Sequence, residues 1–199
     1  MTNLSRRAKI FIVFIAIVIV SAVMAWFSSK KSGVSKDFTQ AREQGALIAQ
    51  NIVTLSDQST KDLAQVNDLD KSGKYTDALV LTTSIVTKNQ NLHDEAISLS
   101  DQIETMATSL PSISSADARQ AALDAISSRL ALVSELVDYS QDLNKLLVTL
   151  QGHFTGTTVQ PGDVQTIVNQ INTDVNAINN FNDQAQQSMI RFDTLEAKS

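Results

Sequence analysis

The pattern of apolar and polar positions divides the chain into one continuous apolar run and a long periodic remainder. The run is Ile10–Phe27, which holds eighteen residues, no charged side chain and one polar side chain, Ser21. From residue 37 onward the apolar residues recur at steps of three and four, which is the spacing of one face of an α-helix. We therefore expect an all-α protein in which an N-terminal transmembrane helix precedes a bundle of long helices.

The apolar run has the length of a membrane span. A helix of these eighteen residues would be roughly 27 Å long, close to the ~30 Å core of a bilayer. Basic residues flank the run on both sides, at residues 6–9 and 30–31, and Trp26 with Phe27 closes it. Aromatic residues and flanking cations are typical of a helix held at a membrane interface, so we predict a retained anchor.

A cleaved signal peptide is the alternative interpretation of the same run. Val23, Met24 and Ala25 place small or short side chains where a signal peptidase would cut. The apolar core of an ordinary signal peptide has roughly 7–15 residues, however, and this run is longer. The length therefore favours the anchor.

Charge sets the expected orientation of the anchor. All six cations up to Lys36 precede the first acid, Asp37, and the flank before the run is slightly more basic than the flank after it. The positive-inside rule then favours a cytoplasmic N-terminus. We expect a short cytoplasmic N-terminus at residues 1–9, a transmembrane anchor at 10–27, a linker at 28–36 and an extracytoplasmic four-helix bundle at 37–199 in a single-pass protein of the cell membrane.

Four periodic stretches predict four long helices. Gly73, Pro111 and Gly152 interrupt the periodicity and are residues that end helices. Because the connections between the stretches are short, neighbouring helices should run antiparallel in an up-down-up-down four-helix bundle. In this topology residues 70–74 and 152–163 lie together at the tip far from the membrane. The predicted helices are Asp37–Asp70, Tyr75–Leu110, Ala116–Gln151 and Val164–Leu195.

Composition removes several function classes. From Asp37 onward the chain holds ten Lys or Arg and all twenty-one acids, a net charge of −11, which should repel nucleic acid and anionic lipid. The absence of Cys excludes disulfides and thiol chemistry. No phosphate-binding glycine motif, nucleophile elbow or Glu-x-x-His pair occurs. We expect a protein that is not an enzyme and that has no catalytic residues, cofactor or metal.

The segment Asp68–Thr76 carries a partial metal-binding pattern. Oxygen side chains at its first, third, fifth and ninth positions and Gly73 at its sixth resemble an EF-hand calcium loop. The resemblance fails at the twelfth position, where Leu79 replaces the bidentate Glu. The stretch beginning at Gly73 also resembles the turn of a tetratricopeptide repeat, although the flanking helices are too long for that unit. We expect a glycine-capped helix end followed by a new helix.

Two polar residues interrupt the inner faces of the predicted helices. Asn89 lies on the seam of the second helix, where a buried amide would specify register. Arg129 lies on the seam of the third helix, and we expect it near the level of Ala96 and Ala185. At the edge of the seam its guanidinium would reach water, whereas against small residues it would line a ligand pocket or fix the register.

The predicted partner contact lies at the distal tip and along part of the fourth helix. Phe154 and Val159 place apolar side chains in an unusually long connection, and Asn176 and Asn180 belong to an amide-rich helix surface. From residue 160 to residue 187 there are twelve Asn and Gln and no Lys or Arg. Amides are less costly to desolvate than charges, which favours contact. In the competing interpretation, Phe154 and Val159 cap the open end of the core.

The leading functional hypothesis is a membrane-tethered, non-catalytic interaction or scaffold module outside the cell that binds a protein partner. The sequence does not predict the oligomeric state. The architecture also resembles the four-helix ligand-binding domains of bacterial chemoreceptors, which implies a ligand sensor. No second apolar run follows Leu195, so such a sensor would lack its own signalling output.

The anchor prediction is tested on the protein isolated from membranes. Intact-mass measurement and N-terminal sequencing should find residues 10–27 still attached, because the run is long enough to span a bilayer. A mature chain that begins at Trp26 would show instead that the run is a cleaved signal.

Overall fold

The computed structural model describes residues 34–158 and 160–198. Within these residues the regular structure is entirely helical, without strands, which confirms the all-α prediction and its four long helices. None of the described helices is long and apolar enough to cross a membrane. The predicted anchor lies outside the described residues. The long helices are α1 (Lys36–Lys71), α2 (Tyr75–Ser109), α3 (Ala116–Phe154) and α4 (Pro161–Glu196), and a short 3₁₀ turn, η3 (Leu110–Ser112), follows α2.

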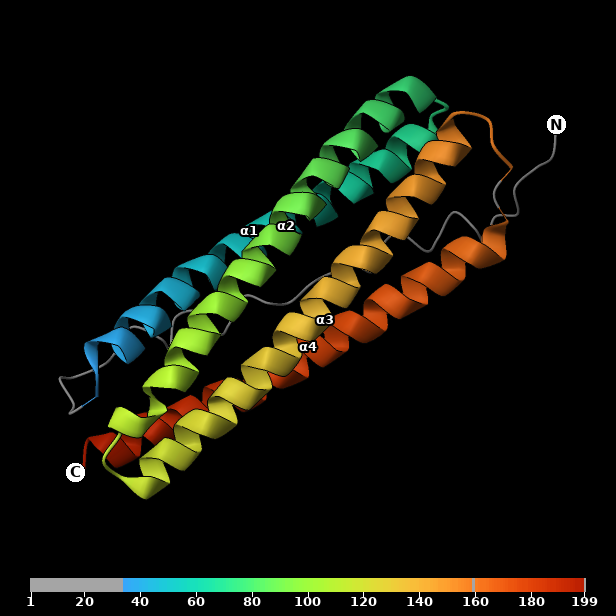
Figure 1. The fold of residues 1–199 in the computed structure, drawn as a ribbon. Helices are drawn as coiled ribbons and strands as arrows, with labels where there is room; N and C mark the ends of the chain where they lie inside the picture. The colour runs from blue at the N-terminus through green and yellow to red at the C-terminus, as the bar shows by residue number, and fades with distance from the viewer. Residues whose placement is uncertain (1–33, 159, 199) are drawn as a thin grey trace.

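The helices form two antiparallel hairpins that pack side by side through α2 and α3 (Figure 1). The α1–α2 turn and the α3–α4 loop share one end of the bundle, here called the distal end. The start of α1, η3 and the end of α4 share the opposite, proximal end. The backbones of α1 and α4 approach closely at few positions, and their contact includes Phe38 and Phe192 at the proximal end, with ring centroids 5.4 Å apart.

Local sequence signals account for the helix ends. Ser35 and Ser115 cap the starts of α1 and α3, because each hydroxyl oxygen accepts a hydrogen bond from the backbone N–H three residues later. Gly73 follows α1 with φ of 71°, a conformation that glycine adopts without strain. The backbone N–H of Lys74 then donates to the Leu69 carbonyl and that of Gly73 to the Asp70 carbonyl, which ends the helix in a Schellman motif.

The end of α3 differs from the prediction. Gly152 was expected to end the helix, but α3 continues through it to Phe154, and Gly156 with φ of 90° ends the helix through the same motif. The α4 helix also begins earlier than expected, so the connection is residues 155–160 rather than 152–163. The loop therefore has an ordinary length for a helix bundle, and Phe154 belongs to a helix rather than to the loop.

The segment that resembles a calcium loop is a helix–turn–helix. Asp68 and Asp70 lie in the last turn of α1, Thr76 lies in the first turn of α2, and Ser72–Lys74 forms the turn between them. The twelve-residue loop of an EF-hand is not formed, because helical backbone occupies most of its positions. The expected glycine turn followed by a new helix is confirmed.

The core runs along the inner faces of all four helices. The α2 positions that recur at steps of three and four from Ala78 to Met106 are all buried, and most of the corresponding α3 positions are buried as well. Most of the α1 positions at this spacing are buried too, among them Phe38, Ile52 and Val66. Ile48 and Leu55 are only half-buried, whereas Arg42 and Ser56 next to the apolar face are buried. Ile113, 1% exposed, follows η3 and closes the proximal end of the core.

Two leucines on α3 test where the core lies. Leu136 is 3% exposed and Leu130 is 47% exposed. Replacing Leu136 by Ala should lower the free energy of unfolding by about 2–5 kcal/mol, since it removes buried methyl groups and leaves a cavity. Leu130→Ala is the matched control and should change it by less than about 1 kcal/mol. Denaturant unfolding that gave equal losses for both would place the core on the wrong face of α3.

Candidate functional site

An aromatic cluster occupies the distal end, where α1, α2 and α3 meet. Tyr75, the first residue of α2, stacks on Phe154 in the last turn of α3, with centroids 6.2 Å apart and planes 24° apart. His153 contacts both rings edge-on or tilted, at 6.0 and 5.4 Å. Its Nε2 lies 3.1 Å from Oδ1 of Asp70, in the last turn of α1. Tyr75 is 47% exposed, so the cluster presents an aromatic surface to solvent.

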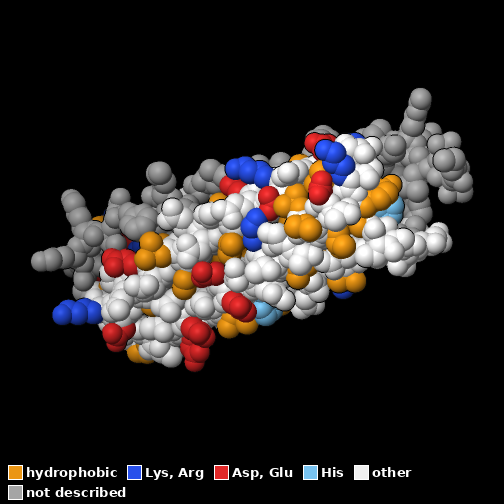
Figure 2. All heavy atoms as spheres, turned by 90° about the horizontal axis from the view of Figure 1, so that it is seen from above, with side chains coloured by type: hydrophobic (Ala, Val, Ile, Leu, Met, Phe, Trp, Pro, Cys, Tyr) orange, Lys and Arg blue, Asp and Glu red, His pale blue; other side chains and the backbone are white. Residues whose placement is uncertain are grey.

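The predicted tip residues have different environments. Phe154 is half-buried and packs against the hydrophobic core as well as on Tyr75, so it contributes to closing the core at this end. Val159 lies outside the described residues. Figure 2 shows that apolar side chains gather toward the distal half of the face seen there. Val80, 68% exposed on α2, is among the exposed apolar side chains of the structure.

Asn176 and Asn180 are exposed on α4 but do not join the aromatic cluster. Asn176 is fifteen residues beyond the start of α4 at Pro161, which places it roughly 22 Å down the helix from the distal end. Amides of this helix bond to one another, since Gln165 Nε2 donates to Asn169 Oδ1 at 2.8 Å. The predicted tip contact and the amide surface are therefore separate features.

Asn89 is buried between the two hairpins. It is 3% exposed, and its Nδ2 donates to the backbone carbonyl of Ser140 on α3 at 2.7 Å. Its Oδ1 has no hydrogen-bond partner. A hydrogen bond from a side chain to one backbone carbonyl fixes the level of α2 against α3, because a shift of one turn would leave both buried groups unsatisfied.

Arg129 is buried, which excludes the interpretation in which its guanidinium reaches water. The side chain is 8% exposed, and Nη1 donates to the Sδ atom of Met106 at 3.5 Å. It therefore lies nearer the proximal end than the predicted level of Ala96 and Ala185. Long helical side chains lean toward the N-terminus of their own helix, and the N-terminus of α3 is at the proximal end.

A partly buried ion pair accompanies Arg129. Arg42 on α1, 5% exposed, donates through both terminal nitrogens to the Asp193 carboxylate on α4, at 2.6 and 2.8 Å. Burial is the main cause that lowers the pKa of Arg129, the charge of Arg42 adds to it and the charge of Asp193 opposes it, and together they bring the pKa to about 9. These interactions bring side chains of all four helices together in the proximal half of the bundle.

A second buried polar pair lies at mid-bundle. Ser56 on α1 and Tyr139 on α3 are each 2% exposed, and burial raises the pKa of Tyr139 to about 12. Ser56 and Tyr139 line a gap among aliphatic side chains that has no room for a water molecule. The Ser56 hydroxyl has no hydrogen bond of ordinary geometry. The gap is too small to be a ligand pocket.

Carboxylates gather along the seam between α3 and α4. Asp174 on α4 is 2% exposed, its Oδ1 accepts from Gln170 Nε2 at 2.9 Å, and its Oδ2 has no partner. Asp142 faces it from α3 and accepts from Lys145 at 2.6 Å. Burial raises the pKa of Asp174, the Gln170 bond lowers it, Asp142 and Asp138 raise it, and Lys145 lowers it. The native fold therefore disfavours the ionised form of Asp174.

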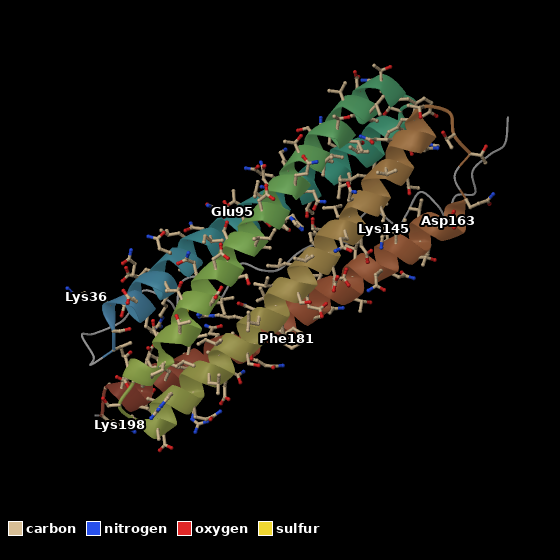
Figure 3. All side chains as sticks on the ribbon, viewed as in Figure 1. Lys36, Glu95, Lys145, Asp163, Phe181 and Lys198 are labelled. Carbon is tan, nitrogen blue, oxygen red and sulfur yellow. The ribbon has the colours of Figure 1, made fainter. Side chains whose placement is uncertain are left out.

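An open polar groove follows the outer side of the α1–α2 hairpin. It has a volume of about 450 Å³, and a hydrogen bond of 3.2 Å from Asn51 Nδ2 to Glu95 Oε1 joins its two walls. Figure 3 marks Glu95 midway along this hairpin. The lining residues are Asn51, Thr54, Leu55 and Gln58 from α1 and Asn91, Asp94, Glu95 and Ser98 from α2.

Comparison with family models, curated proteins and solved structures finds no significant match for this chain. Within residues 34–158 and 160–198, no group of three or more His, Asp or Glu side chains is arranged to hold a metal ion.

Sequence reasoning missed Arg42, Asp174 and the groove. Arg42 follows Ala41 directly, and the three-and-four spacing of apolar residues includes Ala41 but gives no reason to bury its charged neighbour. Asp174 has the spacing of an inward position, between Ile171 and Ile178, and that spacing was its one available signal. No signal in the sequence predicts the groove, because its walls come from polar residues of two helices.

The raised pKa of Asp174 predicts a pH dependence of stability. Because the native state binds this proton more tightly than the unfolded state, stability from this group should increase as pH falls from 7 through the folded pKa toward 4. Asp174→Asn should therefore raise the melting temperature at pH 7, and the advantage should shrink toward pH 4. Asp183→Asn, at an exposed acid of the same helix, is the control and should have little effect. Equal effects of both variants at pH 7 would mean that net charge, not burial, is responsible.

Proposed function

We propose that this protein is a membrane-tethered, non-catalytic interaction module outside the cell that presents its distal end to a protein partner. The observation that carries the proposal is the aromatic cluster of Tyr75, His153 and Phe154, in which Tyr75 is exposed, at the end of the bundle opposite the start of α1. In the sequence the apolar run at residues 10–27 precedes α1 by only the short stretch 28–35. Anchor and contact surface are thereby assigned to opposite ends of one rod.

The length of the rod supports this assignment. Helix α1 has 36 residues, which corresponds to roughly 54 Å along its axis. A bundle standing on a membrane would hold its distal end about that far from the lipid headgroups. In the proposed topology the N-terminus is cytoplasmic, residues 10–27 cross the cell membrane once, and the bundle lies outside.

The chemistry of the distal end suits a protein partner. Tyr offers a large rigid surface with a polar edge, and it is enriched among the residues that dominate binding energy at interfaces. The Tyr75 ring packs on Phe154 and on His153, which in turn contacts Asp70. The Tyr75 side chain therefore has little conformational entropy to lose on binding. We therefore assign Tyr75 to the partner contact and Phe154 chiefly to its support.

A ligand-sensing bundle is the alternative function. The observation that favours it is the polar groove between α1 and α2, whose volume of about 450 Å³ lies within the range of small-molecule sites. The groove and the distal cluster are different surfaces, so the two functions can be tested separately.

A photo-crosslinking amino acid tests the tip assignment in the native membrane. It is placed at position 75, where Tyr75 is 47% exposed, and at position 123, where Leu123 near the start of α3 is 45% exposed. Position 75 should give a discrete crosslinked protein and position 123 should not. Crosslinking at position 123 alone, or equally at both positions, would contradict a distal contact.

Two serine substitutions separate binding from stability in the same experiment. Tyr75→Ser should leave the melting temperature almost unchanged but weaken partner capture. Phe154→Ser should lower the melting temperature, because Phe154 packs on the core. If Tyr75→Ser leaves capture intact, Tyr75 is not the contact.

A further inference from the structure

The charged residues that line the groove between α1 and α2 are all acidic. Of its eight lining residues, Asp94 and Glu95 are acidic, none is Lys or Arg, and Leu55 is the one apolar member. Ionised carboxylates accept hydrogen bonds and donate none, whereas the amides and hydroxyls of the other five residues do both. A molecule that fits this lining must bring positive charge and hydrogen-bond donors.

Nearby cations do not neutralise the two carboxylates. Lys88, one turn before the groove on α2, forms an ion pair with Asp62 of α1. Asp94 has His93 Nδ1 at 3.7 Å, beyond ordinary hydrogen-bond length, and its side chain is 78% exposed. Glu95 accepts from the neutral amide of Asn51. Both carboxylates therefore retain acceptor capacity that faces the groove.

The dimensions of the groove favour a short linear ligand. Its walls run from Asn51 to Gln58 on α1 and from Asn91 to Ser98 on α2, which corresponds to roughly 10 Å along each helix. The lining offers hydrogen-bonding groups over this whole length. The two carboxylates are consecutive residues on α2, and amides and hydroxyls extend along the rest of the groove. A linear amine that places ammonium charge at Asp94 and Glu95 and further N–H groups along the amides fits this lining better than a compact metal ion, since no three of the described carboxylates or imidazoles converge on one point.

We propose that the α1–α2 groove binds a linear organic polyamine, with Asp94 and Glu95 accepting from its ammonium groups and the amides and hydroxyls binding its remaining N–H groups. The net charge of −11 from Asp37 onward raises the local concentration of cations around the bundle and assists the encounter. This inference does not depend on the proposed contact at the distal end.

Calorimetric titration of the full chain in neutral detergent with spermidine tests the proposal. The wild-type protein should bind with one saturable site and with an affinity that falls as salt is added. Asp94→Asn combined with Glu95→Gln should weaken binding by about tenfold, the loss expected for two partly exposed ion pairs. Spermidine should also raise the melting temperature of the wild type but not of this double variant.

A charge-matched double variant is the control. Asp101→Asn with Glu104→Gln removes the same two charges from exposed positions farther along α2, outside the groove. It should leave the affinity almost unchanged. The proposal is overturned if both double variants weaken binding equally or if the wild type shows no saturable site. It is also overturned if Mg²⁺ competes with spermidine for the wild-type protein as well as spermidine itself does at equal ionic strength.

Discussion

The arrangement of the two hairpins depends on the packing of α2 against α3 around the buried hydrogen bond from Asn89 to Ser140. Each hairpin is held internally by a short glycine turn or loop, but those turns do not set the level of one hairpin against the other. Among the described helices, α2 and α3 form the long interface between the hairpins, and α1 approaches α4 closely at few positions. A buried amide with one good bond and one unsatisfied oxygen stabilises weakly. Its main effect is to make other registers worse.

The proximal half adds a second constraint made of charges. Arg42 and Asp193 form a bidentate ion pair between α1 and α4, and Arg129 is buried close enough for both charges to shift its pKa. Taking guanidinium groups out of water is costly, so such a cluster is weak evidence for stability and better evidence for geometric selection. Together with Phe38 and Phe192, it ties the first helix to the last where the chain enters and leaves the bundle. The hairpins are therefore fixed by one uncharged contact at mid-length and one charged contact near an end.

Periodicity predicted the parts of this structure that are governed by burial of apolar surface. The α2 positions from Ala78 to Met106 that follow the three-and-four spacing are all buried, because no other constraint competes with burial there. The failures have particular causes. Gly152 did not end α3, since an interior glycine costs only about 1 kcal/mol and packing of the last turn outweighs it. Arg42 and Asp174 are charged residues at buried positions, where partners on distant helices decide the outcome. The groove around Glu95 depends on how two helices lie against each other, which a one-dimensional pattern does not contain.

The start of α1 lies close to the end of α4, and this has a consequence for the topology of the bundle. Phe38 near the start of α1 touches Phe192 near the end of α4, so a short peptide could join residue 34 to residue 198 without disturbing the bundle. New termini could then be opened at the exposed glycine turn of Gly73 or Gly156. Such a circularly permuted chain would keep all four helices intact and place both termini at the other end of the rod. The packing of the four helices is therefore compatible with more than one chain connectivity, and it does not determine which helix comes first in the sequence.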